Sequence, residues 1–330
     1  MNSICFDLEG PLSPQDNAYE IMKLFPNGGE IFEVISRYDD LLTLEKRDGY
    51  EPGDTLALIV PFLILHNITE NDIASLASKA NLTNGAADFV FWLQTDGWKI
   101  FCISTSYKQY ALHITHKLGI YAHNVACTLF SLDKFRAALS EKDANLLRQG
   151  EKDILKLYPV SDDKEIKQRL DNFFREKLPF TDIGAAINNV KPVGGQRKAS
   201  ALTKFADTYD QPLSKWIVIG DSITDYRMLQ MVEAAGGLAI AFNANEYALP
   251  YATMSLASTS LDDLIEVVVA WQKNSREGVQ ELVKEKEGNG GTGDKGFFNW
   301  LSGSSNIDDK VIAVHKKIRS LVREEAGRLG

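Results

Sequence analysis

The sequence predicts a doubly wound α/β protein that has a Rossmann-like parallel sheet and an inserted helical cap. Short apolar runs alternate with helical segments through residues 82–270, a pattern typical of a parallel sheet with helices on both faces. Acidic or hydroxyl-bearing residues follow several of these runs, at the strand ends where such sheets bind ligands. A helix-rich stretch follows the first run, and the 330-residue length allows a core domain with an accessory unit.

The first apolar run ends at Asp7 and predicts a buried strand. Helical spacing of apolar residues and turn-forming dipeptides then place the remaining elements. The predicted helices lie at 17–25, 31–44, 55–65, 72–79, 86–95, 107–118, 199–209, 226–234 and 261–271, and the later strands at 98–104, 124–130, 216–220 and 237–242. A charged segment with helical periodicity follows the strand at 124–130 and predicts a second insertion.

These elements divide the chain into three parts. Residues 1–12 and 82–270 form the predicted core, which carries the second helical insertion at about 132–180. Residues 13–81 form the predicted helical cap. The charged part of the second insertion has two interpretations, a solvated face or a lid over the site.

The remaining residues, 271–330, are predicted to be a linker followed by a helical tail. The glycine-dense stretch at 288–293 is typical of a flexible linker, and residues 308–323 have the apolar spacing of one amphipathic helix. We interpret this tail as an appendage for packing or self-association. It is therefore a candidate contact for a homo-oligomer or a protein partner.

Composition restricts the classes of partner. The net charge is −9 and the pI is about 5.2, which argues against binding to nucleic acid or anionic lipid surfaces. The first apolar run is interrupted by acids, and no apolar stretch reaches the length of a membrane span, so we expect a cytoplasmic protein. Cys5, Cys102 and Cys127 are too few and too separated for a disulfide framework, and we expect Cys5 and Cys102 to be buried strand thiols.

Four short pieces of the chain carry chemically useful residues at predicted strand ends or at the start of a helix. Because strand ends of a parallel sheet lie along one edge, we expect these side chains to meet around one pocket. The pieces are Asp7 with Glu9, Ser104 with Thr105, Lys198, and Asp221 with Asp225.

This set suits attack by a carboxylate on a phosphorus atom. A phosphate monoester is a dianion that repels an anionic nucleophile, so a cation must neutralise both. Mg²⁺ prefers oxygen ligands, which Asp7, Asp221 and the backbone carbonyl of Glu9 can supply. Lys198 and the Ser104 hydroxyl would hold the phosphoryl oxygens.

The motifs Asp7-Leu8-Glu9-Gly10 and Gly220-Asp221-Ser222-x-x-Asp225-x-x-Met228-Leu229 resemble those of the haloacid dehalogenase superfamily of phosphohydrolases, over about residues 1–270. The resemblance implies a haloacid dehalogenase-like core and Mg²⁺-dependent hydrolysis of a small phosphorylated metabolite through an aspartyl-phosphate. It implies that Asp7 is the nucleophile, that Glu9 is the acid/base, that Ser104, Thr105 and Lys198 bind phosphate, and that Asp7, Glu9, Asp221 and Asp225 form the metal site, with Asp225 alternatively orienting the lysine.

Three alternatives stay open. Most phosphatases of the superfamily have Asp at the position of Glu9, and the sequence is similar to the branch that contains a bifunctional phosphoserine phosphatase and homoserine phosphotransferase. Transfer to an alcohol therefore competes with hydrolysis. Lys191 competes with Lys198 as the motif lysine, although Lys198 is favoured because it lies near a predicted helix N-terminus. A non-catalytic subunit that keeps the fold is the third alternative.

Overall fold

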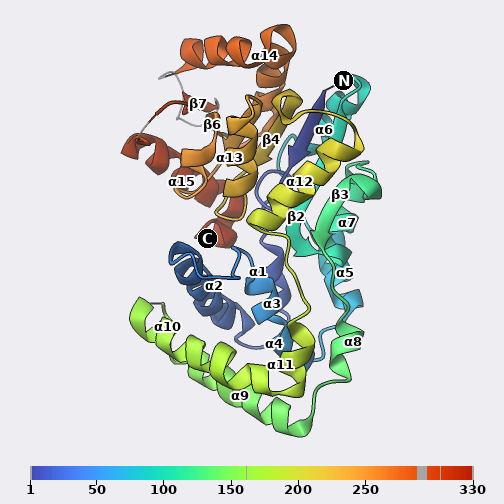
Figure 1. The fold of residues 1–330 in the computed structure, drawn as a ribbon, viewed down its shortest axis with the longest axis vertical. Helices are drawn as coiled ribbons and strands as arrows, with labels where there is room; N and C mark the ends of the chain where they lie inside the picture. Colours follow the sequence, from blue (N-terminus) through green and yellow to red (C-terminus); the bar gives the residue numbers. More distant parts are fainter. Residues whose placement is uncertain (1, 161, 288–295, 305, 329–330) are drawn as a thin grey trace.

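The computed structural model describes residues 2–160, 162–287, 296–304 and 306–328 (Figure 1). The predicted linker at 288–293 lies outside the described residues. The strands are β1 (Ser3–Phe6), β2 (Lys99–Tyr107), β3 (Val125–Thr128), β4 (Trp216–Gly220), β5 (Leu238–Phe242), β6 (Met254–Ala257) and β7 (Phe297–Trp300). The helices before β4 are α1 (Asn17–Met22), α2 (Gly28–Leu44), α3 (Thr55–Leu58), α4 (Val60–Leu65), α5 (Glu70–Lys79), α6 (Ala86–Thr95), α7 (Lys108–Lys117), α8 (Leu132–Arg136), α9 (Glu141–Leu155), α10 (Asp163–Asp171), α11 (Asp182–Ile187) and α12 (Gln196–Thr208). The later helices are α13 (Tyr226–Ala234), α14 (Leu264–Lys286) and α15 (Asp309–Arg323).

The described strands form one seven-stranded sheet in the order β3-β2-β1-β4-β5-β6-β7. All neighbouring pairs are parallel except β6 and β7, which are antiparallel. The strand order reverses direction at β1 and β4, so the carboxyl ends of these two strands flank the topological switch point, where sheets of this kind bind ligands. The predicted α/β class is confirmed.

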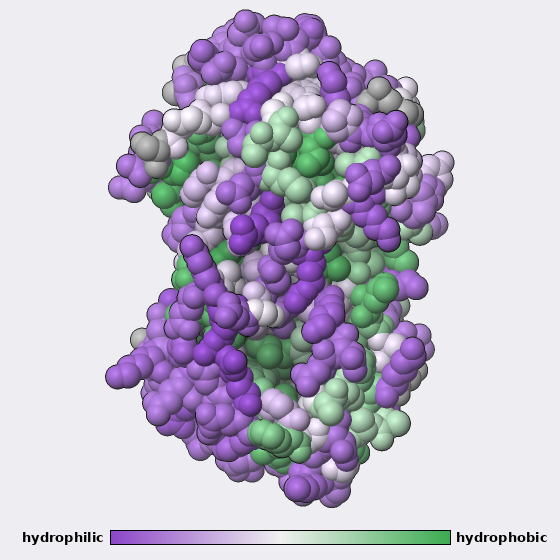
Figure 2. Space-filling view, in the orientation of Figure 1, coloured by the Kyte–Doolittle hydropathy of each residue, from purple (hydrophilic) through white to green (hydrophobic). Residues whose placement is uncertain are grey.

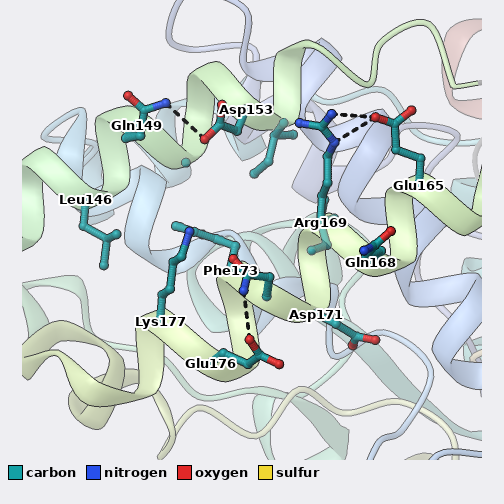
Figure 3. Close-up of a pocket in the computed structure, with 14 residues that line it drawn as sticks. Leu146, Gln149, Asp153, Glu165, Gln168, Arg169, Asp171, Phe173, Glu176 and Lys177 are labelled. Atoms are coloured by element: carbon teal, nitrogen blue, oxygen red, sulfur yellow. Dashed lines mark hydrogen bonds and ion pairs between the residues drawn. The ribbon is translucent and has the colours of Figure 1, made fainter.

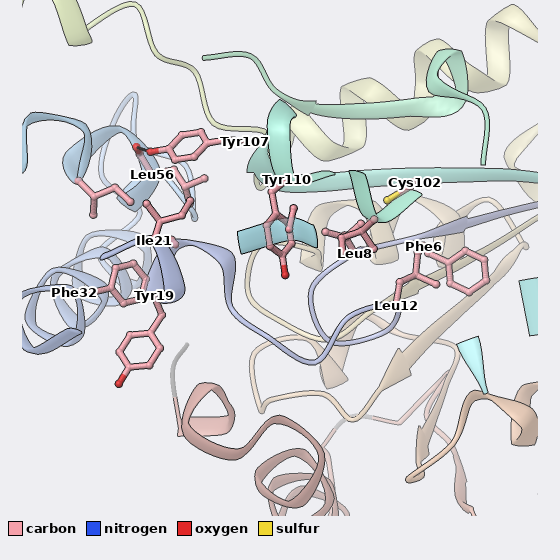
Figure 4. Close-up of a cluster of buried hydrophobic side chains, with 14 of the residues drawn as sticks. Phe6, Leu8, Leu12, Tyr19, Ile21, Phe32, Leu56, Cys102, Tyr107 and Tyr110 are labelled. Atoms are coloured by element: carbon pink, nitrogen blue, oxygen red, sulfur yellow. Dashed lines mark hydrogen bonds between the residues drawn. The ribbon is translucent and has the colours of Figure 1, made fainter. Parts of the chain in front are cut away.

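Alternate residues of each strand pack on opposite faces of the sheet. Phe6 and Cys102 pack in a cluster with α6, α7 and α14, whereas Cys5 packs in a second cluster with α12, α13 and α15. Both cysteines are buried, as predicted. The first cluster continues without a break into the cap, where Tyr19 and Phe32 belong to it (Figure 4). The sheet and the cap therefore share one hydrophobic core.

The two predicted insertions pack together as one helical unit. Tyr38 of α2 stacks on Phe174 with ring centroids 6.0 Å apart, and Phe62 of α4 stacks on Phe173 at 6.1 Å. Arg37 of α2 pairs with the Asp163 carboxylate through two hydrogen bonds of 2.8 and 2.7 Å. Figure 1 shows this unit below the sheet, and in Figure 2 the molecule narrows between the two parts.

Several elements differ from the predictions. The predicted helix at 55–65 is divided into α3 and α4, where Pro61 lies in the first turn of α4 and cannot donate a backbone hydrogen bond. Segment α14 is interrupted at Asn274 and Ser275, whose backbone angles are not helical, so its first part ends close to the predicted end at 271 and its second part, up to Lys286, was not predicted. The short strands β6 and β7 were not predicted.

The tail is the largest difference. It adds β7 to the edge of the sheet and packs α15 against the same face as α12 and α13, so packing, one of the two predicted roles, is observed, whereas self-association stays a prediction. No single helix among the described residues has the length and hydrophobicity to cross a bilayer; Thr55–Leu65 and Glu70–Lys79 reach that composition only together, as a pair bent by 115°.

The docking of α15 gives a prediction for acid stability. His315 is fully buried, its Nδ1 accepts a hydrogen bond of 2.9 Å from the Ala244 amide, and burial with the nearby Arg319 charge lowers the pKa of His315 to about 3. An unfolded histidine has a pKa of about 6.5, so below that pH the unfolded state binds one more proton than the folded state. We expect the protein to lose about 2 kcal/mol of unfolding free energy between pH 6.5 and pH 5 through this residue.

Urea unfolding at both pH values measures this loss. The variant His315→Asn keeps an acceptor for Ala244 but removes the titration, so its stability should fall by about 2 kcal/mol less than that of the wild type over the same interval. His123→Asn, at an exposed position, is the matched control. Equal acid sensitivity of His315→Asn and the wild type would contradict the prediction.

Candidate active site

Three carboxylates converge beyond the carboxyl ends of β1 and β4. Asp7 directly follows β1, and its amide donates a hydrogen bond of 2.8 Å to Ile219 of β4, so the two strand ends stay in register. Asp221 directly follows β4, and Asp225 precedes α13. One oxygen of each carboxylate lies within 4.8 Å of the other two, and all three residues are buried. Among the described residues this is the one such group with metal-binding geometry.

Gly10 explains how the turn after β1 can lie against Asp221. Its φ of +103° belongs to the region that favours glycine. A Cβ atom at this position would collide with the Asp221 carboxylate. The glycine of the first motif is therefore required by the close approach of the two motifs.

Lys198 lies between two of the carboxylates. It sits in the first turn of α12, and its Nζ is 2.8 Å from Asp7 Oδ1 and 2.7 Å from Asp225 Oδ1. Asp225 Oδ2 accepts hydrogen bonds from the amides of Asp221 (3.0 Å) and Ser222 (3.1 Å), which fixes its orientation. These contacts are those expected of an acid that orients the lysine, and the metal-binding role of Asp225 stays a prediction.

The alternative lysine lies elsewhere. Lys191 is exposed and lines a separate cavity beside Tyr50 and Phe174, none of which borders the carboxylates. The geometry favours Lys198 as the motif lysine.

The buried carboxylates of the cluster need nearby positive charge to stay ionised. Burial raises the pKa of Asp7 well above its usual range, the adjacent Asp225 raises it further, and Lys198 opposes both. Although burial lowers the pKa of Lys198, the Asp225 and Asp7 carboxylates raise it by more. The lysine therefore stays charged, and three buried carboxylates gain from additional cations.

Glu9 and Thr105 line the cavity beside this cluster. Glu9 Oε1 accepts a hydrogen bond of 2.6 Å from the Asn17 amide, and burial followed by repulsion from Asp16 raises the pKa of Glu9 to about 7. Thr105 lines the cavity beside Asp7, and its Oγ1 donates a hydrogen bond of 3.0 Å to Val193.

Ser104 is placed differently. It is fully buried, and its Oγ accepts a hydrogen bond of 3.0 Å from the Ser106 amide. The cavity that contains Asp7 has Thr105 but not Ser104 among the described residues of its wall. A phosphate-binding role for Ser104 stays a prediction.

The cap closes over the cluster. The cavity has a volume of about 90 Å³, and Asp16, Asp39, Asp40 and Leu56 of the cap face Asp7 and Asp221 across it. The Tyr107 hydroxyl donates to the Leu56 carbonyl and joins the cap to β2. None of the described residues that line this cavity comes from 132–180, and the lid interpretation of that segment stays a prediction.

A larger cavity of about 700 Å³ lies within the second insertion, between α9 and α10 (Figure 3). Its wall contains none of the predicted site residues. Its polar groups pair with one another, as in Gln149 with Asp153 and Arg169 with Glu165. This cavity offers no convergent set of groups for catalysis.

Two arginines of α15 enter the site and were not predicted. The Arg319 and Arg323 guanidinium groups both bind Asp221 Oδ2, Arg323 at 2.8 Å. The four-residue spacing of His315, Arg319 and Arg323 could have indicated a buried polar face on this helix. The apolar spacing of residues 308–323 predicts that Leu321 lies on or near the packed face of the helix, yet Leu321 is 64% exposed.

Comparison with known families decides the assignment. A family model of the haloacid dehalogenase-like hydrolases matches residues 86–267, more than half of the chain. The chain belongs to the haloacid dehalogenase-like hydrolases. The predicted superfamily resemblance is therefore confirmed.

Solved structures of similar fold agree with this assignment. A gene product from Archaeoglobus fulgidus is 27% identical to this haloacid dehalogenase-like hydrolase, with a TM-score of 0.86 over 100% of this chain and 99% of that chain. A phospho-aspartyl intermediate analogue of phosphoserine phosphatase is 16% identical, with a TM-score of 0.52 over 80% of this chain and 97% of that chain, a likeness that shows the fold alone. Curated protein sequences gave no match.

Proposed function

We propose that this hydrolase is a Mg²⁺-dependent phosphatase that acts on a small phosphomonoester through an aspartyl-phosphate on Asp7. The observation that carries the proposal is the buried group formed by Asp7, Lys198, Asp225 and Asp221 at the switch point of the sheet. Membership of the hydrolase family and the fold shared with a phosphoserine phosphatase support it.

The donor set suits a hard divalent cation. Three buried carboxylates with an oxygen each inside 4.8 Å match the oxygen preference of Mg²⁺, which usually keeps several waters. Asp7, Asp221 and Asp225 would hold the ion, and the Glu9 backbone carbonyl is a further candidate ligand. When bound, the cation would neutralise part of the negative charge of the phosphoryl group.

The first step follows from how Asp7 is held. Its Oδ1 accepts a hydrogen bond of 2.7 Å from the Leu8 amide and contacts Lys198, so we assign Oδ2 as the nucleophile. Oδ2 attacks phosphorus, the ester P–O bond breaks, and Glu9 gives its proton to the leaving oxygen. The pKa of about 7 for Glu9 suits this transfer near neutral pH.

In the second step, water attacks the same phosphorus atom. Glu9 takes the proton of the water, the bond between phosphorus and Asp7 Oδ2 breaks, and inorganic phosphate leaves. Lys198 would stabilise the charge on Asp7 and the phosphoryl oxygens in both steps.

The neighbouring space supports a leaving group of modest size. The 90 Å³ cavity has room for a phosphoryl group and few other atoms. A second cavity of about 450 Å³ shares Ser36, Asp40 and Arg319 with it and has mostly polar walls. We assign this second cavity to the polar remainder of the substrate.

A panel of phosphorylated metabolites tests the proposal. Phosphate release should require Mg²⁺, disappear with a chelator and return when Mg²⁺ is restored. Trapping with acid during turnover should recover phosphate covalently bound to the peptide that contains Asp7. Absence of phosphate release across the panel, together with stable co-purification of a partner, would favour a non-catalytic role.

Glu9 is the proposed base in hydrolysis of the phospho-enzyme, and this role gives a separate prediction. In Glu9→Gln, formation of the phospho-enzyme from p-nitrophenyl phosphate should change little because this leaving group needs no proton, whereas its hydrolysis should slow by about 10²-fold or more. Rapid-quench measurement resolves the two steps. Glu277→Gln, at an exposed position on α14, is the control.

Unchanged hydrolysis of the phospho-enzyme in Glu9→Gln would remove Glu9 as the base. Adding small alcohols to the same reaction separates hydrolysis from transfer. A phosphorylated alcohol formed in place of inorganic phosphate would make the enzyme a phosphotransferase.

A further inference from the structure

The polar face of α15 contacts the loops that follow three strands of the sheet. His315, Arg319 and Arg323 are all buried and recur at every fourth residue. His315 binds the Ala244 amide after β5, Arg319 contacts Asp221 after β4, and Arg323 Nε donates to the Pro14 carbonyl (3.0 Å) in the segment after β1. Helix α15 is thus built into the catalytic end of the sheet.

Both guanidinium groups act on one atom. Asp221 Oδ2 accepts from Nη1 of Arg319 and from Nη1 of Arg323. A cation in the carboxylate cluster would therefore find Oδ1 of Asp221 as its remaining ligand atom. The two guanidinium groups together bring two positive charges to this one carboxylate.

The arginines set the net charge of the cluster. Asp7, Asp221 and Asp225 bring three negative charges, and Lys198, Arg319 and Arg323 bring three positive ones. A divalent cation would then leave a net charge of +2 on these six groups, which offsets the charge of a phosphate dianion. Without the two arginines, the cation and Lys198 would only cancel the carboxylates.

Two further acids near the cluster increase the negative charge that the arginines compensate. Glu9 and Asp16 line the same cavity and lie close enough to Arg323 to interact with it electrostatically. Buried ion pairs are expensive to desolvate, and an apolar residue would anchor a helix equally well. The placement of two arginines here is explained better by electrostatics of the site than by packing.

We propose that Arg319 and Arg323 are positioning residues that neutralise Asp221, so that the charge of a bound divalent cation stays available to a phosphate dianion. This proposal rests on the proposed phosphatase function. It makes the C-terminal helix an obligatory part of phosphate binding rather than an accessory.

Calorimetric titration of the full chain with Mg²⁺ alone, and with inorganic phosphate in saturating Mg²⁺, tests the proposal. In Arg319→Gln/Arg323→Gln, phosphate binding should weaken about tenfold or more. Mg²⁺ alone should bind at least as tightly as in the wild type, because two repelling charges are gone. Arg319→Lys/Arg323→Lys should restore most of the phosphate affinity, and Lys317→Gln, at an exposed position on the same helix, should change neither affinity.

Unchanged phosphate affinity in the glutamine variant would overturn the proposal. Joint loss of Mg²⁺ and phosphate binding would do the same, since it would mean that the arginines only maintain the shape of the site. If the double glutamine variant does not fold, the lysine variant and the single variant Arg323→Gln decide by the same measurement. A wild-type protein that binds Mg²⁺ and phosphate but hydrolyses no ester would refute the proposed function while leaving this charge assignment intact.

Discussion

Replacing Asp7 with asparagine should lower kcat by at least about four orders of magnitude, since the amide cannot form the aspartyl-phosphate and no other carboxylate occupies its position. The fold should remain. Lys198 keeps Asp225 as its ion-pair partner at 2.7 Å, and the substitution removes one of three clustered negative charges. We therefore expect the unfolding free energy to stay within about 1 kcal/mol of the wild type.

Steady-state assays with the best ester from the panel measure the first effect, and urea unfolding measures the second. Asp207→Asn removes a carboxylate at an exposed position of α12 and should leave both quantities unchanged. Substantial phosphatase activity in Asp7→Asn, after acid trapping has excluded wild-type contamination, would remove Asp7 as the nucleophile.

The central strands and the acidic motifs could be predicted because local pattern and tertiary environment agree there. The run that forms β4, Trp216–Gly220, is apolar throughout because both faces of a central parallel strand are buried. Asp7 and Asp221 follow such runs directly, so the edge at which they meet follows from the parallel arrangement alone.

The tail could not be predicted on the same grounds. The Phe297–Trp300 strand is short and pairs with β6 through contacts that no local pattern specifies. For α15, the apolar spacing indicated a helix correctly, but its buried face is set by Arg319 and Arg323 on Asp221, about a hundred residues away in the chain. Charged side chains are ordinarily predicted to be exposed to solvent. Arg319 and Arg323 are buried because the acidic cluster of the folded protein pairs with them.

The division into core, cap and tail stays a prediction. The structure nevertheless shows why the boundaries of the cap are hard to predict from the sequence. Residues 13–81 and 132–180 are separated by the core segment that contains α6, β2, α7 and β3, and aromatic contacts such as Tyr38 with Phe174 join them into one unit. Contacts of that kind depend on the fold of the intervening sheet, so sequence periodicity reveals the two helical segments but not their association.

Lys198 offers the second large effect, on stability and activity together. Its ammonium group is fully buried between Asp7 and Asp225, both of which are also buried. Lys198→Met keeps the length of the side chain but leaves two buried carboxylates without their nearest cation. Breaking a buried ion pair from one side costs about 3–5 kcal/mol, so we expect a loss of unfolding free energy in that range and activity below detection.

The loss of unfolding free energy in Lys198→Met should depend on the other charges near Asp7 and Asp225. Saturating Mg²⁺ should recover part of the lost stability, because a bound cation can neutralise the same carboxylates and stabilises only the folded state. The double variant Lys198→Met/Asp225→Asn should be more stable than Lys198→Met alone, whereas Lys204→Met, at an exposed position of the same helix, should resemble the wild type. Stability of Lys198→Met equal to that of the wild type would contradict the ion-pair network inferred here, since such a cluster of buried acids cannot remain ionised without a compensating charge.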